Sequence, residues 1–205
     1  MIKKLSPYLS GLVELTLALI LPIPLVLTFL VGLPSEKMPH AMTFSLGIFA
    51  YVWMLLTLYI SVKPSWLSQF INTRIAYINQ LLLTSIALVT SFFHQNMNLS
   101  SGVNLIVAML AVSVLMVFAG YSIIYSLAKS LLIKPLGIYQ NRLRMIVTTL
   151  NSLGVVMVLL HVHLISYVRA NILFMVLCDG MSIPIITYII YKWLRPVQKT
   201  AKQLN

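Results

Sequence analysis

Six long apolar runs, separated by short polar stretches, constrain this chain more than any other feature. A helix that spans a bilayer needs about 20 mainly apolar residues, and turn-forming sequences such as Lys63-Pro64-Ser65 divide the runs. We therefore predict an all-α integral membrane bundle of six helices, forming a single domain over residues 1–205. The predicted spans are residues 11–33, 43–62, 77–95, 102–128, 144–168 and 171–193.

The composition excludes an ordinary soluble protein. Only 8% of the residues are charged, whereas a soluble domain has about 25%, and the mean hydropathy is +0.98. Six spans with short loops leave no room for a soluble catalytic domain, so an enzyme that carries its own nucleotide-binding domain is excluded. The first run is longer than the core of a signal peptide, and we expect it to be a retained helix.

The distribution of basic residues predicts the orientation. Six spans place both termini on one side of the membrane, and twelve of the 14 Lys and Arg residues then share that side, with only Lys37 and Arg169 on the other. Basic loops face the cytoplasm, so we expect both termini to be cytoplasmic. The twelve are Lys3, Lys4, Lys63, Arg74, Lys129, Lys134, Arg142, Arg144, Lys192, Arg195, Lys199 and Lys202.

The net charge of +11 therefore indicates orientation in a lipid bilayer more than a charged partner. The cations are spread over separate cytoplasmic segments without a binding fold, so nucleic acid is not an expected partner. The segment 129–144 interleaves cations with apolar residues, which is typical of a segment lying on anionic lipid. It is equally suited to docking a cytoplasmic reductase.

All four histidines fall on the predicted outer side. His94 lies near the outer end of the third span, and His161 and His163 near the outer end of the fifth, while His40 lies in the first outer loop. Imidazole is the usual protein ligand of a haem iron. Because the third and fifth spans run in the same direction, His94 and His161 reach similar depths, which permits a bis-imidazole site. The alternative is four interfacial histidines that hydrogen-bond to neighbouring helices or headgroups.

His163 competes with His161 for the same role. Two residues along a helix correspond to about 200° of rotation, so the two side chains do not face one site. Arg169, Lys37 and Tyr167 are candidates for holding the haem carboxylates, or they are ordinary interface anchors.

The chain resembles ferric reductase-like transmembrane domain proteins. Residues 47–56 (GIFAYVWMLL), 59–67 (YISVKPSWL), 77–80 (YINQ) and 93–95 (FHQ) resemble the second and third spans of that family, and 159–165 (LLHVHLI) the fifth. The resemblance implies the six-helix cytochrome b core that NADPH oxidases, metalloreductases and the membrane subunit of bacterial methionine sulfoxide reductase share in outline.

The resemblance also implies where haem b would bind. The family carries two stacked haems, held by two histidines about four helical turns apart on each of the third and fifth spans. The outer positions match His94 and His161, with His163 as the nearby competitor. Gln80 and Thr148 occupy the inner positions, and neither is a good iron ligand. We therefore expect one outer haem b and an inner polar cluster of Asn79, Gln80, Thr148 and Asn151.

A single outer haem changes the expected electron path, because the inner half of the membrane is left without a carrier. The donor is then a lipid-soluble quinol, or the inner polar cluster binds another redox group, or haem has been lost. The same polar side chains also suit plain interhelical hydrogen bonds, each worth about 1 kcal/mol.

The expected function is a membrane electron-transfer subunit that passes electrons outward to a flavin-containing partner or an extracellular acceptor. It would depend on that partner for activity, since it has no flavin or nicotinamide site. The alternatives are a small membrane transporter or substrate-binding component, and a haem-free scaffold subunit that kept the cytochrome fold.

The remaining polar and helix-breaking residues support narrower expectations. Asp179 lies inside the sixth span, where an acid suits proton acceptance from a quinol or serves as a hydrogen-bonded structural group. Glu14 is expected to pair with Lys3, Lys4 or headgroups. The one cysteine, in the sixth span, is expected to have a packing role. The prolines are expected to kink their spans and to free carbonyls that neighbours must satisfy; these are Pro22, Pro24 and Pro184.

Overall fold

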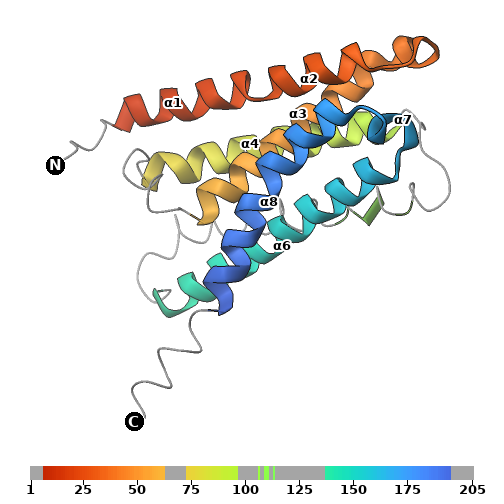
Figure 1. Ribbon diagram of the computed structural model, residues 1–205. Coiled ribbons are helices and arrows are strands. Elements are labelled where there is room, and N and C mark those ends of the chain that lie inside the picture. Colours follow the sequence, from red (N-terminus) through yellow and green to blue (C-terminus); the bar gives the residue numbers. More distant parts are fainter. Residues whose placement is uncertain are drawn as a thin grey trace.

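The computed structural model describes residues 7–62, 73–96 and 137–194, together with residues 106, 109, 110 and 113. Within that part every regular element is a helix, as the apolar runs predict (Figure 1). The predicted fourth span, apart from those four residues, and the first part of the basic segment 129–144 lie outside the described residues. The elements are α1 (Pro7–Ile20), α2 (Pro22–Val31), the 3-10 helix η1 (Ser35–His40), α3 (Ala41–Val62), α4 (Thr73–Asn96), α6 (Gly137–Leu164), α7 (Ser166–Arg169) and α8 (Ile172–Leu194).

Three described helical segments are long and apolar enough to cross a membrane: Gly11–Val31, Ser35–Val62 and Ile172–Lys192. They coincide with the predicted first, second and sixth spans. α4 and α6 contain shorter apolar stretches, Leu82–His94 and Thr148–Leu164. Much of the apolar surface of the outer helices is exposed, for example at Leu12, Leu19 and Val176, which suits contact with lipid. These features are compatible with a membrane protein.

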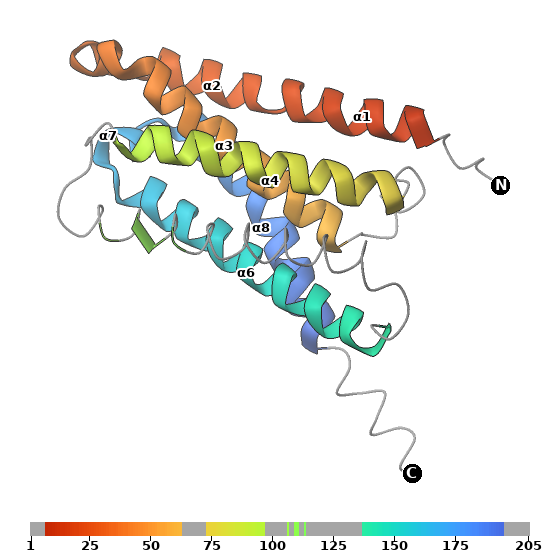
Figure 2. The same ribbon diagram turned by 180° about the vertical axis from the view of Figure 1, so that it is seen from behind.

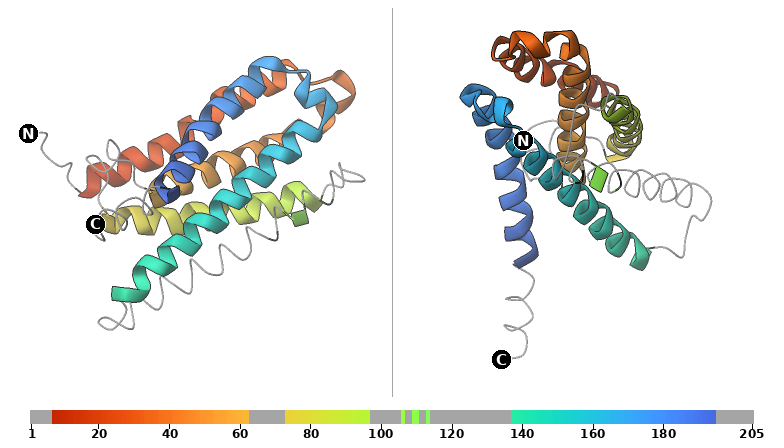
Figure 3. Two further views of the ribbon diagram at one scale, coloured as in Figure 1. Left: turned by 60° about the horizontal axis from the view of Figure 1, so that its bottom comes forward. Right: turned by 90° about the vertical axis from the view of Figure 1, so that its right-hand side faces the viewer.

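α3 is the central helix of the described part. It contacts α1, α2, α4, α6 and α8. In the segment Ser35–Val62, which contains α3, 61% of the most apolar stretch is buried inside the protein, against 28% in Gly11–Val31 and 33% in Ile172–Lys192. In the end-on view on the right of Figure 3, α3 lies between α4 and α8, with α1 and α2 above it. Because α3 is enclosed by its neighbours, side chains from each of them contact it. The candidate site lies against this helix.

The break between α1 and α2 occurs at Pro22, as expected for a proline within a span. Pro22 has no N–H, so the carbonyl of Ala18 loses its usual donor one turn later. The indole Nε1 of Trp53 in α3 donates to the Ala18 oxygen at 2.9 Å. The predicted freed carbonyl is therefore satisfied by a neighbouring helix, and α1 and α2 follow one another along the bundle (Figures 1 and 2).

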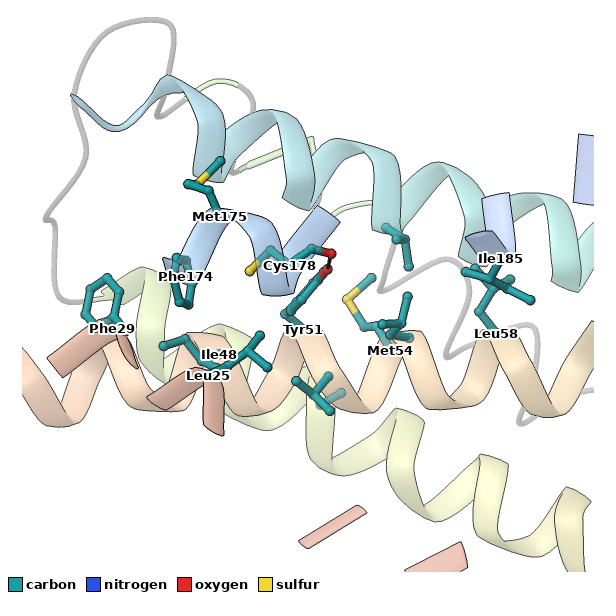
Figure 4. Packing of buried hydrophobic residues seen from close by; sticks show 14 of the residues in the cluster. Leu25, Phe29, Ile48, Tyr51, Met54, Leu58, Phe174, Met175, Cys178 and Ile185 are labelled. Atoms are coloured by element: carbon teal, nitrogen blue, oxygen red, sulfur yellow. Dashed lines mark hydrogen bonds between the residues drawn. The ribbon is translucent and has the colours of Figure 1, made fainter. Parts of the chain in front are cut away.

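Two tyrosines of α3 bind the backbone of α8. The Tyr51 hydroxyl donates to the Cys178 carbonyl at 3.0 Å and also shares a hydrogen bond with the Ser182 hydroxyl. The Tyr59 hydroxyl donates to the Met181 carbonyl at 3.1 Å. These bonds reach the part of α8 that precedes its internal proline, and Figure 4 shows Tyr51 and Cys178 side by side in the buried cluster. Cys178 is itself buried in the core.

Aromatic rings close one end of this core. Phe29 of α2 packs edge-on against Phe44 of α3 and Phe174 of α8, with ring centroids 5.5 and 5.2 Å apart. Tyr167 of α7 extends the group, because its ring centroid lies 6.0 Å from that of Phe44. Four separate elements are joined here, at the end of the bundle where the predicted outer histidines lie.

The helix of the predicted fifth span ends earlier than expected. The span was predicted to continue to Val168, but α6 ends at Leu164 and Ile165 is extended, with φ −85° and ψ 109°. A short helix, α7, then places Val168 in the core, where it is 4% exposed. Burying Val168 and the Tyr167 ring against the bundle offsets the interruption of the helix, and hydropathy alone does not reveal this turn.

Asn171 links the start of α8 to the end of α2. Its Oδ1 accepts the Phe174 N–H at 3.1 Å, which caps α8, and its Nδ2 donates to the Thr28 carbonyl at 2.7 Å. The approach depends on Gly32, where a Cβ would clash with the Asn171 side-chain amide. One side chain thus satisfies a helix N-terminus and a carbonyl in the last turns of another helix.

Candidate functional site

His94 and His161 lie against one another where α4 and α6 approach at one end of the bundle. Their ring centroids are 6.4 Å apart and their planes are at 85°. Both side chains lie near the C-terminal ends of helices that run in the same direction (Figure 2). The structure therefore brings together the two histidines that the sequence places at similar depth.

The His94 ring is held by α3. Its Nδ1 lies 2.9 Å from the carbonyl oxygen of Thr43, and because a carbonyl only accepts, the proton must be on Nδ1. In the neutral ring Nε2 is then the nitrogen with the free lone pair. Ligating histidines are commonly oriented by such a bond from the other ring nitrogen, and the bond to Thr43 leaves Nε2 as the nitrogen of this ring with an available lone pair.

Gly47 allows the His94 ring to lie directly on the α3 backbone. A Cβ at this position would lie 2.9 Å from both Cε1 and Nδ1 of His94, closer than real Cβ contacts. In the sequence, Gly47 stands out only as part of the stretch 47–56 that resembles a family. The signal that was available is a glycine one helical turn after Thr43, but nothing in the sequence indicates which side chain covers it.

His163 has different partners from His161. Its Nδ1 lies 2.8 Å from the Leu159 carbonyl of its own helix, and its Nε2 lies 3.5 Å from Oδ2 of Asp179 in α8. Nδ1 thus donates to its own helix, and Nε2 faces the Asp179 carboxylate of α8. The structure places the competing ligand beside the predicted proton acceptor, and it places His161 beside His94.

The three candidates for haem carboxylates lie in the connecting elements at the same end. Lys37 is half-buried in η1, and Arg169 is exposed in α7. Tyr167 is half-buried and packs against Phe44. Since η1 precedes α3 and α7 follows α6, these residues surround the end at which His94 and His161 meet. His40 is exposed in η1.

The predicted inner polar cluster is divided between two helix pairs. Nδ2 of Asn79 in α4 donates to Oε2 of Glu14 in α1 at 2.7 Å. Nδ2 of Asn151 in α6 donates to the Thr57 hydroxyl of α3 at 2.9 Å. Thr148 is buried in α6. These contacts are interhelical hydrogen bonds, the alternative to a bound redox group for these side chains.

Two details of this region extend the sequence-based expectation. Glu14, for which the sequence suggests a pairing with Lys3, Lys4 or headgroups, is 5% exposed and accepts a hydrogen bond from Asn79. Lys3, Lys4 and the Gln80 side chain lie outside the described residues. Asn151 is 1% exposed, and its Oδ1 has no hydrogen-bond donor within the part of the chain that the structure describes.

In the described ranges, no three His, Cys, Asp or Glu side chains come together as a metal-binding group. No protein-family model, no curated protein and no solved structure matches this chain. The functional proposal therefore depends on the histidine pair and its surroundings.

Proposed function

We propose that this protein is a membrane-embedded haem b electron-transfer subunit of the ferric reductase-like class. In this proposal it is a six-helix bundle of the cell membrane with both termini in the cytoplasm, and it passes electrons outward to a flavin-containing partner or an extracellular acceptor. The observation that carries the proposal is the pairing of His94 with His161 at 6.4 Å. These two residues would hold the iron of one haem near the outer end.

The nearness of the two rings supports this role, because their centroids lie 6.4 Å apart and imidazole is the usual protein ligand of a haem iron. The Thr43 carbonyl, which fixes the proton of His94 on Nδ1, adds independent support. Haem b, when bound, supplies a one-electron redox centre at this position.

The surrounding residues would orient the cofactor and limit water. Phe29, Phe44 and Phe174 pack against one another at the same end of the core and would keep that end apolar. Lys37 and Arg169 lie in the connecting elements there and offer cations for the haem carboxylates. The site would thus combine an apolar interior with charged residues at the membrane surface.

A lipid-soluble quinol is the donor that we propose, since one outer haem leaves no inner carrier. Oxidation of a quinol to a quinone releases two electrons and two protons. The haem would take the electrons one at a time and pass each to the acceptor, and the protons need an acceptor of their own. Asp179 is suited to that task, because its side chain is 33% exposed and its Oδ2 lies 3.5 Å from Nε2 of His163. The pair would take a proton at the carboxylate and share it with the imidazole.

The test of haem binding is the reduced-minus-oxidised absorption spectrum of the protein purified in detergent from haem-supplied cells. We expect Soret and α bands that disappear in His94→Ala and in His161→Ala. His163→Ala is the matched control, two residues away on the same helix, and should keep the bands. A colourless, well-folded protein would contradict the proposal. Bands that survive His161→Ala and vanish in His163→Ala would show that the ligand assignment is wrong.

The quinol step has its own test. A quinol analogue should reduce the haem of the protein in liposomes, and Asp179→Asn should slow that reduction. An unchanged rate in Asp179→Asn would remove this carboxylate from the proton path while leaving the haem assignment intact.

A haem-free scaffold subunit is the second candidate, and two observations favour it. The two imidazoles already contact one another edge to face, and Asn79 and Asn151 are bonded to Glu14 and Thr57 across helices. The bonds of Asn79 and Asn151 also make a transporter less suitable. In a transporter these polar side chains would line a solute cavity, whereas here they are bonded to neighbouring helices. The colourless outcome of the spectrum would select the scaffold.

A further inference from the structure

We propose that Gly47 and the Thr43 carbonyl form a seat on α3 that positions the His94 imidazole and sets its tautomer. The seat consists of these two residues only. Its ligand-positioning role rests on the proposed function, but the seat itself is a property of the protein without any cofactor. Gly47 is thus a positioning residue for the ligand.

Two independent contacts define the seat. The carbonyl oxygen of Thr43 lies 2.9 Å from Nδ1 of His94, and an added Cβ at Gly47 would lie 2.9 Å from Cε1 and Nδ1 and 3.2 Å from Cγ of the same ring. Residues 43 and 47 are one turn apart, so they lie on the same face of α3. One edge of the His94 ring therefore packs directly on the α3 backbone at Gly47, and its Nδ1 donates to the α3 backbone at Thr43.

The choice of residue at position 47 is informative because glycine weakens a helix relative to alanine. A glycine inside the buried, central α3 therefore needs a reason, and the ring against it supplies one. Gly180 in α8 shows the contrast: a Cβ there would meet nothing within 4 Å. The two glycines lie inside helices, but only Gly47 is required by a contact with a predicted site residue.

The seat leaves His94 little freedom. α3 and α4 pack along one another, so the backbone that carries His94 is held against the helix that carries the seat. The ring also lies close to that of His161, with the two centroids 6.4 Å apart. A methyl group at position 47 must therefore push the ring away from the Thr43 carbonyl or into its partner, and either movement displaces the ligating nitrogen.

The direct test is nitrogen NMR of cofactor-free protein labelled with ¹⁵N-histidine, at about pH 8, where an ordinary histidine is neutral. The chain has four histidines, and the His94 signals are assigned by their loss in His94→Ala. We expect the Nδ1–H tautomer for His94. Observation of the Nε2–H tautomer would overturn the seat, and no substitution at position 47 is needed for this result.

The role of Gly47 is tested by Gly47→Ala in the same experiment. The His94 signals should shift or lose the Nδ1–H tautomer, whereas Gly180→Ala should leave them unchanged. Gly32→Ala is a second control, because it creates a clash with Asn171. It shows whether a clash elsewhere in the protein also changes the His94 signals. Unchanged His94 signals in Gly47→Ala, or equal changes in Gly32→Ala, would overturn the assignment.

The haem-loaded protein gives a separate result. Gly47→Ala should shift the α band and the midpoint potential relative to wild type, and Gly180→Ala should not. If the His94 tautomer is as expected but no haem spectrum forms, the seat stands and the proposed function is wrong. If haem binds but His94 has the other tautomer, the seat is wrong and the proposed function stands.

Discussion

Individual polar side chains within the apolar helices of this protein are bonded across helix boundaries. Asn151 donates to Thr57, Asn79 donates to Glu14, and Trp53 donates to the backbone of α1. An unpaired polar group in a lipid-like interior costs free energy, so each residue is held where its partner lies. At the scale of the residue, these bonds fix how neighbouring helices are rotated against each other.

The bond between Asn151 and Thr57 gives a first prediction. Thr57→Val or Asn151→Leu alone should lower the free energy of unfolding by about 1 kcal/mol, because each removes the buried hydrogen bond between the two side chains. The double variant should lose less than the sum of the two, since the shared bond is lost only once. Unfolding of the detergent-solubilised protein by a denaturing detergent measures the difference. Additive losses would show that the bond contributes nothing.

At the scale of the element, helix interruptions are where the structure differs most from a set of uniform spans. The break at Pro22 was predictable, because proline removes a known donor from a known position. The break at Ile165 was not, because it depends on burying Tyr167 and Val168 against other helices. The donor that satisfies the Ala18 carbonyl was not predictable either, since it comes from the helix that happens to lie alongside.

The Trp53 bond to Ala18 gives a prediction about the proline break. Trp53→Phe should destabilise the protein by about 1 kcal/mol, because the Ala18 carbonyl loses its donor. Pro22→Ala restores an N–H that can reach this carbonyl, so Trp53→Phe should cost less in the Pro22→Ala background. Thermal unfolding of the four proteins measures the coupling. An equal cost in both backgrounds would show that the indole bond is unrelated to the proline.

Asn171 gives a prediction about the junction of α2 and α8. Asn171→Ala removes both the helix cap and the bond to Thr28, and should cost about 1–2 kcal/mol. Asn171→Ser keeps a capping oxygen but is too short to replace the second bond, so its cost should be intermediate. The melting temperatures give the order. A serine variant as unstable as the alanine variant would mean that the cap contributes little.

At the scale of the whole molecule, hydropathy predicted the positions of the helices but not their pairing. The predicted spans 11–33, 43–62 and 171–193 match described helices closely, because a bilayer-length apolar run is a strong local signal. Which faces meet depends on the rotation of each helix. That rotation is set by contacts such as His94 on Gly47, between residues far apart in the chain.

The candidate site shows the same limit. The helical geometry of 200° between residues two apart indicated that His161 and His163 face different ways, and in the structure they contact different helices. The division of the polar cluster into an α1–α4 pair and an α3–α6 pair was beyond the sequence. Spacing along one helix does not tell which neighbour a polar side chain meets.

The orientation of the whole chain is also testable. The native Cys178 is buried, so it should react slowly with a membrane-impermeant maleimide. We expect Ser35→Cys, in η1, to be labelled from outside intact cells, and Gln203→Cys to be labelled only after the membrane is opened. Labelling of Gln203→Cys in intact cells would contradict cytoplasmic termini.

The electron paramagnetic resonance spectrum of the oxidised, haem-supplied protein tests the central claim most directly, because two axial imidazoles give a low-spin iron. We predict a low-spin signal in the wild-type protein and in His163→Ala. His94→Ala and His161→Ala should each replace it with a high-spin signal or lose the haem. A low-spin signal that persists in either of these two variants, or a folded protein without any haem signal, would contradict the account.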